Sequence, residues 1–86
     1  MPEISRFYGI IIAMFYADHN PPHFHARYGS EKVIIEIGSF SILGGSFSPR
    51  ALGLVIEWAS QHEEELMNNW DLAKNNKALK KIDPLK

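Results

Sequence analysis

The sequence predicts an α+β fold: a small antiparallel sheet of three to four strands, followed by a long or kinked C-terminal helix and an extended tail. Over residues 23–28 and 32–37 apolar residues recur at every second position, which is the spacing of a half-buried strand. In the second half they recur at helical spacing after a serine–proline start. A chain of 86 residues has room for one hydrophobic core. We therefore expect a single domain over residues 1–86, mainly β over 1–47, mainly helical over 49–76 and extended over 77–86.

The first two predicted strands come before a proline-rich break. Residues 4–7 open the sheet, and Gly9 marks a bend. Residues 10–16 are apolar on both faces, as expected of a central strand. Residues 18–22, with the sequence DHNPP, end that strand because neither proline can donate a hydrogen bond to a sheet.

The next two predicted strands flank the tight turn Gly29-Ser30. Residues 23–28 alternate strictly, so one face carries Phe24, Ala26 and Tyr28 and the other carries His23, His25 and Arg27. Residues 32–37 follow, with Val33, Ile35 and Ile37 on their apolar face. A last short strand over residues 40–43 is expected to end at a Gly44-Gly45 turn.

The helical segment begins at Ser48-Pro49, with the serine as cap and the proline in the first turn. Its apolar stripe consists of Leu52, Val55, Ile56, Ala59, Leu66, Trp70 and Ala73. One helix over residues 49–76 would be about 42 Å long at about 1.5 Å per residue, whereas a globule of this size is roughly 30 Å across. We therefore expect a break or kink, with Ser60 and Glu63 as a capping box, or an end that overhangs and packs on a partner.

Two features accompany the helix. Leu79, Ile82 and Leu85 are expected to anchor the extended tail. Trp58 lies off the main apolar stripe, so it belongs either to the core or to a surface that contacts a partner.

Composition narrows the class of protein. The chain has no cysteine, which excludes a disulfide framework and a thiolate metal site. The longest apolar run, Ile10 to Phe15, is too short for a bilayer, which takes about 20 residues, and the N-terminus lacks the features of a signal peptide. We expect a cytoplasmic protein with no membrane partner. The net charge of −1 argues against a large nucleic-acid footprint but is compatible with a local basic patch.

A cluster of histidines is the sharpest feature of the sequence. His19, His23 and His25 lie within seven positions. His23 and His25 share a strand face, which puts their Cβ atoms roughly 7 Å apart, and His19 is expected to fold back across the two prolines. Arg27 lies two positions further along the same face.

This cluster suits acid–base catalysis. Imidazoles titrate near neutral pH, so one removes a proton while another donates one. Arg27 can hold a phosphate bidentately and stabilise the charge of a transition state. His19, His23, His25 and Arg27 would together suit metal-independent cleavage of RNA, for which no cofactor is expected.

Two other interpretations remain open. The neutral imidazoles of His19, His23 and His25 can bind zinc or another divalent metal, with Asp18 or Glu36 as a fourth ligand or as a hydrogen-bond partner of the ligands. Alternatively, the histidines only hydrogen-bond the backbone of the proline turn and fix its shape.

Six short segments distributed along the chain resemble segments of a known protein family. They are Ser5-Arg6-Phe7-Tyr8-Gly9, Asp18-His19-Asn20-Pro21-Pro22-His23-Phe24-His25, Pro49-Arg50-Ala51-Leu52, Glu57-Trp58-Ala59, Asn69-Trp70 and Leu79-Lys80-Lys81-Ile82. In these segments the chain resembles a family of short prokaryotic proteins catalogued as a domain of unknown function, number 4160. The resemblance implies a small stand-alone protein, often encoded beside a second small protein in an arrangement that looks like a toxin–antitoxin pair. The resemblance points to His19, His23 and His25 as candidate functional residues but assigns no role to any of them.

The leading hypothesis is a toxin-like component of a prokaryotic toxin–antitoxin-type module. It would cleave RNA through His23 and His25 as the acid–base pair, with Arg27 on the phosphate and a small antitoxin-like protein as its partner. The alternatives are a non-enzymatic protein-interaction module with a structural histidine turn, and a three-histidine divalent-metal-binding protein. The sequence is also compatible with assembly into a homo-oligomer.

Overall fold

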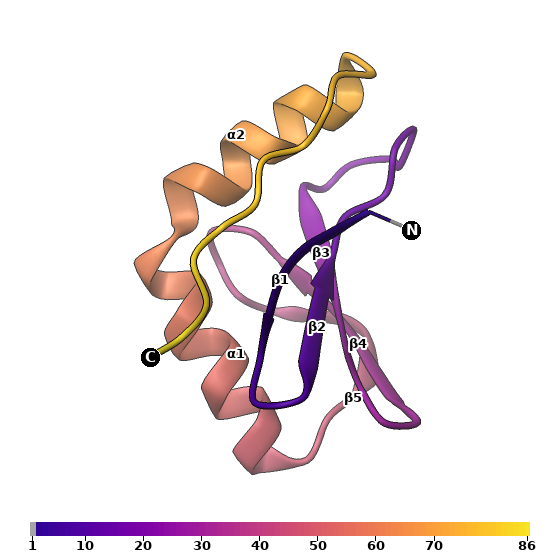
Figure 1. Ribbon diagram of the computed structural model, residues 1–86. Helices are drawn as coiled ribbons and strands as arrows, with labels where there is room; N and C mark the ends of the chain where they lie inside the picture. Colours follow the sequence, from indigo (N-terminus) through magenta and orange to yellow (C-terminus); the bar gives the residue numbers. More distant parts are fainter. Residues whose placement is uncertain (1) are drawn as a thin grey trace.

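Five consecutive strands form one antiparallel sheet in chain order: β1 (Glu3–Phe7), β2 (Ile10–Ala13), β3 (His23–Tyr28), β4 (Glu31–Glu36) and β5 (Ile42–Ser46). Figure 1 shows this computed structural model, which describes residues 2–86. Met1, the first residue of the predicted domain, lies outside the described residues. The α+β prediction is confirmed, but the sheet has five strands instead of the predicted three or four.

Strand boundaries differ most from the prediction in β2 and β5. The apolar run that starts at Ile10 leaves the sheet after Ala13, although we expected it to continue to residue 16. Ala17 adopts a left-handed conformation (φ 58°), which turns the chain away from the strand direction. The predicted Gly44-Gly45 turn lies inside β5, where a register shift and the left-handed Gly45 (φ 74°) keep the strand paired with β4.

The helical segment is broken, as the length argument predicted: it consists of two helices, α1 (Pro49–Gln61) and α2 (Glu63–Lys74), and is not one long helix. Ser48 lies at the N-cap position of α1 and Pro49 in its first turn, as predicted, but the Ser48 side chain makes no capping hydrogen bond to the described residues. The predicted capping box of Ser60 and Glu63 is wrong in its detail. The break lies at His62, which has non-helical backbone angles, and the Ser60 hydroxyl instead donates a hydrogen bond to the Glu57 carbonyl at 2.8 Å.

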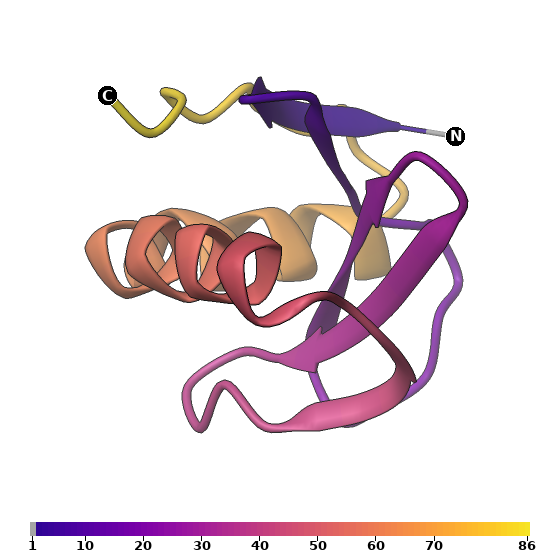
Figure 2. The ribbon, with the colours of Figure 1, turned by 90° about the horizontal axis from the view of Figure 1, so that it is seen from below.

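The sheet curls around the two helices, so the core lies between the inner face of the sheet and the helical layer (Figure 2). Trp58 is fully buried at the centre of this core, with its ring 5.4 Å from that of Phe7 and 6.0 Å from that of Phe24. It therefore belongs to the core and is not a partner surface. Because the helices cover only one face, the other face of the sheet, which we call the open face, carries the side chains of alternate residues.

The tail over residues 77–86 runs along α2 and beside β1 (Figure 1). Asn69 of α2 is fully buried, and its side chain makes two hydrogen bonds of 2.9 Å to the backbone N–H and carbonyl of Lys80. Further on, the Ile82 N–H donates to the Ile4 carbonyl at 2.8 Å, and the Trp58 indole donates to the tail at 2.8 Å. The predicted anchors Ile82 and Leu85 are buried, and Leu79 packs against the core.

The two edges of the sheet are therefore different. The tail covers part of the outer edge of β1, whereas β5 pairs with β4 only. Neither α1 nor α2 combines the length and the apolar character that a membrane crossing requires, within residues 2–86.

Candidate metal-binding site

The candidate site lies where β3 begins, against the loop that connects β2 to β3. Ala17, in its left-handed conformation, comes just before Asp18 in this loop. At the other end of the loop, the Pro22 carbonyl accepts a hydrogen bond from the Ile37 N–H at 2.9 Å. The loop is thus held beside β3, and Asp18 meets side chains that project from the strand.

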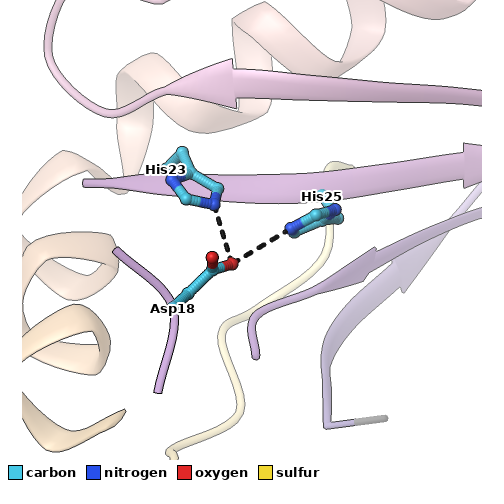
Figure 3. A group of neighbouring side chains, drawn as sticks. All are labelled: Asp18, His23 and His25. Atoms are coloured by element: carbon cyan, nitrogen blue, oxygen red, sulfur yellow. Dashed lines mark hydrogen bonds and ion pairs between the residues drawn. The ribbon is translucent and has the colours of Figure 1, made fainter. Parts of the chain in front are cut away.

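Two histidines of β3 meet the same carboxylate oxygen. His23 Nε2 lies 2.8 Å from Asp18 Oδ2, and His25 Nε2 lies 3.5 Å from that oxygen. Figure 3 shows both imidazole rings turned toward Asp18. The two rings are themselves close, with centroids 5.3 Å apart. One potential ligand atom from each of the three residues lies within 4.8 Å of the others.

The sequence-predicted site residues separate into two groups. The structure brings together His23 and His25, which share a face of β3 as expected. The His19 side chain is 95% exposed and is not a member of this group, although its Nδ1 is 3.8 Å from Asp18 Oδ1. Arg27 lies further along β3 and does not touch Asp18. The third member of the cluster is therefore Asp18, which the sequence suggested as a fourth ligand or as a hydrogen-bond partner of the ligands.

The hydrogen bonds around the cluster fix its orientation. His23 Nδ1 is 2.7 Å from the Pro21 carbonyl oxygen, which can only accept, so Nδ1 carries a hydrogen. The His19 backbone N–H donates to Asp18 Oδ1 at 3.1 Å, which leaves Oδ2 for the imidazoles. Such bonds from backbone groups hold metal-ligating histidines and carboxylates in place.

The bond to Pro21 has an electrostatic consequence. A neutral His23 with its hydrogen on Nδ1 turns the lone pair of Nε2 toward the Asp18 carboxylate, and two lone pairs repel at 2.8 Å. The contact is favourable only if a proton, carried by either group, or a metal cation lies between the two groups. Figure 3 shows that the His25 ring nitrogen is directed at the same Asp18 oxygen as His23.

The pKa shifts follow from burial and from this contact. Burial raises the pKa of the Asp18 carboxyl, but the hydrogen bond and charge of His23, with the His19 N–H, outweigh burial and hold that pKa below its usual range. Burial lowers the pKa of His25, Asp18 opposes that effect, and the charge of His23 lowers the pKa further. His25 is therefore more readily neutral than a free histidine, as a metal ligand must be.

The site is partly shielded from solvent. The His23 side chain is 9% exposed and packs against Trp70, with ring centroids 5.2 Å apart. The His25 ring contacts Phe15 edge to face at 4.5 Å and is 28% exposed. Solvent thus reaches the cluster on its His25 side.

A cavity of about 270 Å³ opens on that side. It lies on the open face, and its walls are formed by Ile11, Ala13, Phe15, His25, Ala26, Arg27, Lys32, Val33, Ile34 and Gly45. Arg27 and His25 thus line one cavity, as their common strand face predicted. Lys32 of β4, the cross-strand partner of Arg27, also lines it.

These features define a small α+β protein with a cluster of two histidines and one aspartate beside an open cavity. Comparison with known sequences places it further: a sequence model of the family described as Domain of unknown function (DUF4160) matches residues 9–71. The chain belongs to this family, as the sequence resemblance indicated. No curated protein and no solved structure matches the chain.

Proposed function

We propose that this protein binds a divalent transition-metal ion through Asp18, His23 and His25, and that the ion serves a hydrolytic reaction. The observation that carries the proposal is the gathering of one ligand atom from each of Asp18, His23 and His25 within 4.8 Å of one another, with both imidazole Nε2 atoms turned to Asp18 Oδ2. Two ligands of a tetrahedral zinc ion, each at about 2.0–2.1 Å, lie about 3.3 Å apart. The two distances to Asp18 Oδ2, 2.8 Å and 3.5 Å, bracket that value, and the two imidazole nitrogens lie within 4.8 Å of each other.

A metal explains the cluster more completely than a structural clamp does. The Asp18–His23 contact and the bond to Pro21 could serve only to fix the proline turn. His25 is not needed for that purpose, because its 3.5 Å contact is at the outer limit of a hydrogen bond. A cation accounts for all three residues, since it attracts each lone pair.

The ligand set favours a reactive centre over a closed structural one. Structural zinc sites use four protein ligands, whereas catalytic sites use three and leave a position for water or substrate. A metal-bound water has its pKa lowered toward about 7 and so supplies a nucleophile at neutral pH. We therefore propose hydrolysis of a phosphodiester such as RNA, within the toxin-like role and with the small antitoxin-like partner inferred from the sequence.

Metal-independent cleavage by a His23–His25 acid–base pair has less support. His23 has both ring nitrogens engaged and is 7% exposed, so a substrate cannot readily reach it. His25 remains accessible and could act alone as a base. A chelator separates the two mechanisms, because only the metal-dependent one stops when the metal is removed.

Calorimetric titration of the metal-free protein with zinc tests the proposal. We expect one ion per chain for the wild type. Loss of a direct ligand in Asp18→Asn or His25→Gln should weaken binding by more than the 10–100-fold that loss of an outer hydrogen-bond partner costs. His19→Gln is the matched control, because His19 neighbours Asp18 in sequence but lies outside the cluster. Binding should be unchanged in this variant.

The result that would overturn the proposal is the absence of stoichiometric binding, or equal affinity in the wild type and in Asp18→Asn. RNA incubated with zinc-loaded and chelator-treated protein then tests the hydrolytic step. If cleavage persists in chelator and is lost in His25→Gln, the mechanism is metal-independent acid–base catalysis and not metal-dependent hydrolysis. Growth on overexpression, with and without the neighbouring gene product, tests the toxin-like role.

A further inference from the structure

Two positively charged side chains, those of Arg27 and Lys32, lie next to each other on the open face. Arg27 of β3 and Lys32 of β4 are direct cross-strand partners, so their side chains project side by side. Within residues 2–86 neither side chain forms an ion pair with a carboxylate. Like charges directly opposite each other destabilise a sheet. A pair of this kind calls for an anion that neutralises it.

The cavity beside the pair is suited to such an anion. Arg27 and Lys32 both line it, and no aspartate or glutamate does among the described residues. Guanidinium and ammonium groups together bind phosphate well, the first bidentately and the second as a compact charge. The cavity is therefore electrostatically complementary to phosphate in spite of the chain's net charge of −1.

The remaining walls are apolar and partly aromatic. Phe15, Ile11 and Ile34 are half-buried and contribute apolar surface beside the two cations. An aromatic face beside a phosphate-binding cation is the combination that holds a nucleobase and its phosphate together. A volume of about 270 Å³ lies just below the range of drug-sized ligand sites, which span about 300–1,000 Å³. It suits one nucleotide unit.

We infer that this cavity binds one nucleotide unit, with its phosphate between Arg27 and Lys32 and its base against Phe15. The nucleotide comes either free in solution or as part of a single strand of nucleic acid. His25 belongs both to the cavity and to the Asp18 cluster, so a phosphate in the cavity lies next to the group that would act on it. Only that last step rests on the proposed function, because the phosphate contacts do not involve a metal.

Fluorescence anisotropy of a labelled short oligouridylate, measured in chelator, tests the inference. We expect Arg27→Gln and Lys32→Gln each to weaken binding about 10–100-fold, since each removes a charged hydrogen bond to phosphate. Each variant should also lower the slope of log affinity against log salt by about 0.7, the value for one phosphate contact on a single strand. Arg50→Gln is the matched control, because Arg50 lines a different cavity of about 370 Å³ beside Tyr8 and Tyr28.

Competition separates the two sources of the nucleotide. Displacement of the oligomer by uridine 5′-monophosphate identifies a site for free nucleotides, whereas displacement by unlabelled oligomer alone identifies a site that needs a strand. Both results support the inference. It is overturned if none of these probes binds, if the Arg27→Gln and Lys32→Gln variants bind as the wild type does, or if only Arg50→Gln loses binding.

Folding and metal binding are measured separately from nucleotide binding. Lys32→Gln relieves the like-charge pair, so its urea midpoint should equal or exceed that of the wild type while nucleotide binding falls. Asp18→Asn should keep nucleotide binding in chelator. If the protein binds zinc but no nucleotide, this inference is overturned and the proposed metal site stands. If it binds the nucleotide but no zinc, this inference stands and the proposed metal site is overturned.

Discussion

Substitution of Gly45 by alanine should destabilise the fold strongly, whereas the same change at its neighbour should not. Gly45 has φ 74°, in the left-handed region that favours glycine, and lies in β5 opposite Val33. A Cβ added there would overlap the Lys32 carbonyl oxygen, which is a backbone atom of β4. Neither the conformation nor the contact can relax without moving β5 away from β4.

The expected cost can be worked out from these contacts. The left-handed conformation costs a residue with a Cβ about 1–2 kcal/mol, and overpacking adds about 1–3 kcal/mol. The reduced entropy of the unfolded chain returns about 0.4–1 kcal/mol. The net loss is about 2–4 kcal/mol in the free energy of unfolding, a large part of the roughly 5–15 kcal/mol that holds a domain folded. It corresponds to a fall in Tm of about 10–30 °C in a domain of this size.

Urea denaturation and thermal melting of the two variants measure this difference. Gly44 is the matched control, since it precedes Gly45 in the same strand and an added Cβ would make only an ordinary 3.5 Å contact with Ile34 Cδ1. Gly44→Ala should stay within about 0.5 kcal/mol of the wild type. The reasoning fails if the two variants have the same stability, because the conformation and the close approach of Gly45 are its only basis.

Three further changes test other parts of the fold. Asn69→Ala should cost about 2–3 kcal/mol in urea denaturation and expose residues 77–86 to protease, because two hydrogen bonds to Lys80 are lost; an unchanged midpoint would contradict the role of this residue. Ser5→Ala should raise stability by about 1 kcal/mol, because the Ser5 hydroxyl is buried without a hydrogen-bond partner among residues 2–86; a lower midpoint would refute this. In metal-free protein, the lowered pKa of His25 means that the unfolded chain takes up that proton first as the pH falls below about 6.5, so stability is lost on acidification. His25→Gln should flatten the decline of the urea midpoint between about pH 7 and pH 5, and parallel declines in the two proteins would disprove the assignment.

The strand pair around Gly29-Ser30 could be predicted because local sequence determines it. Strict alternation over residues 23–28 assigns each side chain to a face, and the tight turn fixes the register. His25 and Arg27 on one face follow directly. The same register pairs Arg27 with Lys32, so the position of this lysine beside Arg27 could also have been predicted from the sequence.

Other features depend on contacts between distant segments, which local patterns do not encode. The exposure of His19 and the approach of Asp18 to the imidazoles depend on how the proline-rich loop turns, and so does the early end of β2. The pairing of β5 depends on a register shift against β4. Trp58 could not be assigned to the core because the tail that covers it arrives 25 residues later.

The hydrogen bond between Ile82 and Ile4 also has a consequence for synthesis on the ribosome. A nascent chain has made β1 and β2 long before residue 82 emerges, so the outer edge of β1 stays open while the sheet forms. Bringing together segments from nearly opposite ends of the chain carries a large entropic cost and is slow compared with forming the hairpins. The tail therefore docks last, and until it does, the newly made protein presents a strand edge that other chains can pair with.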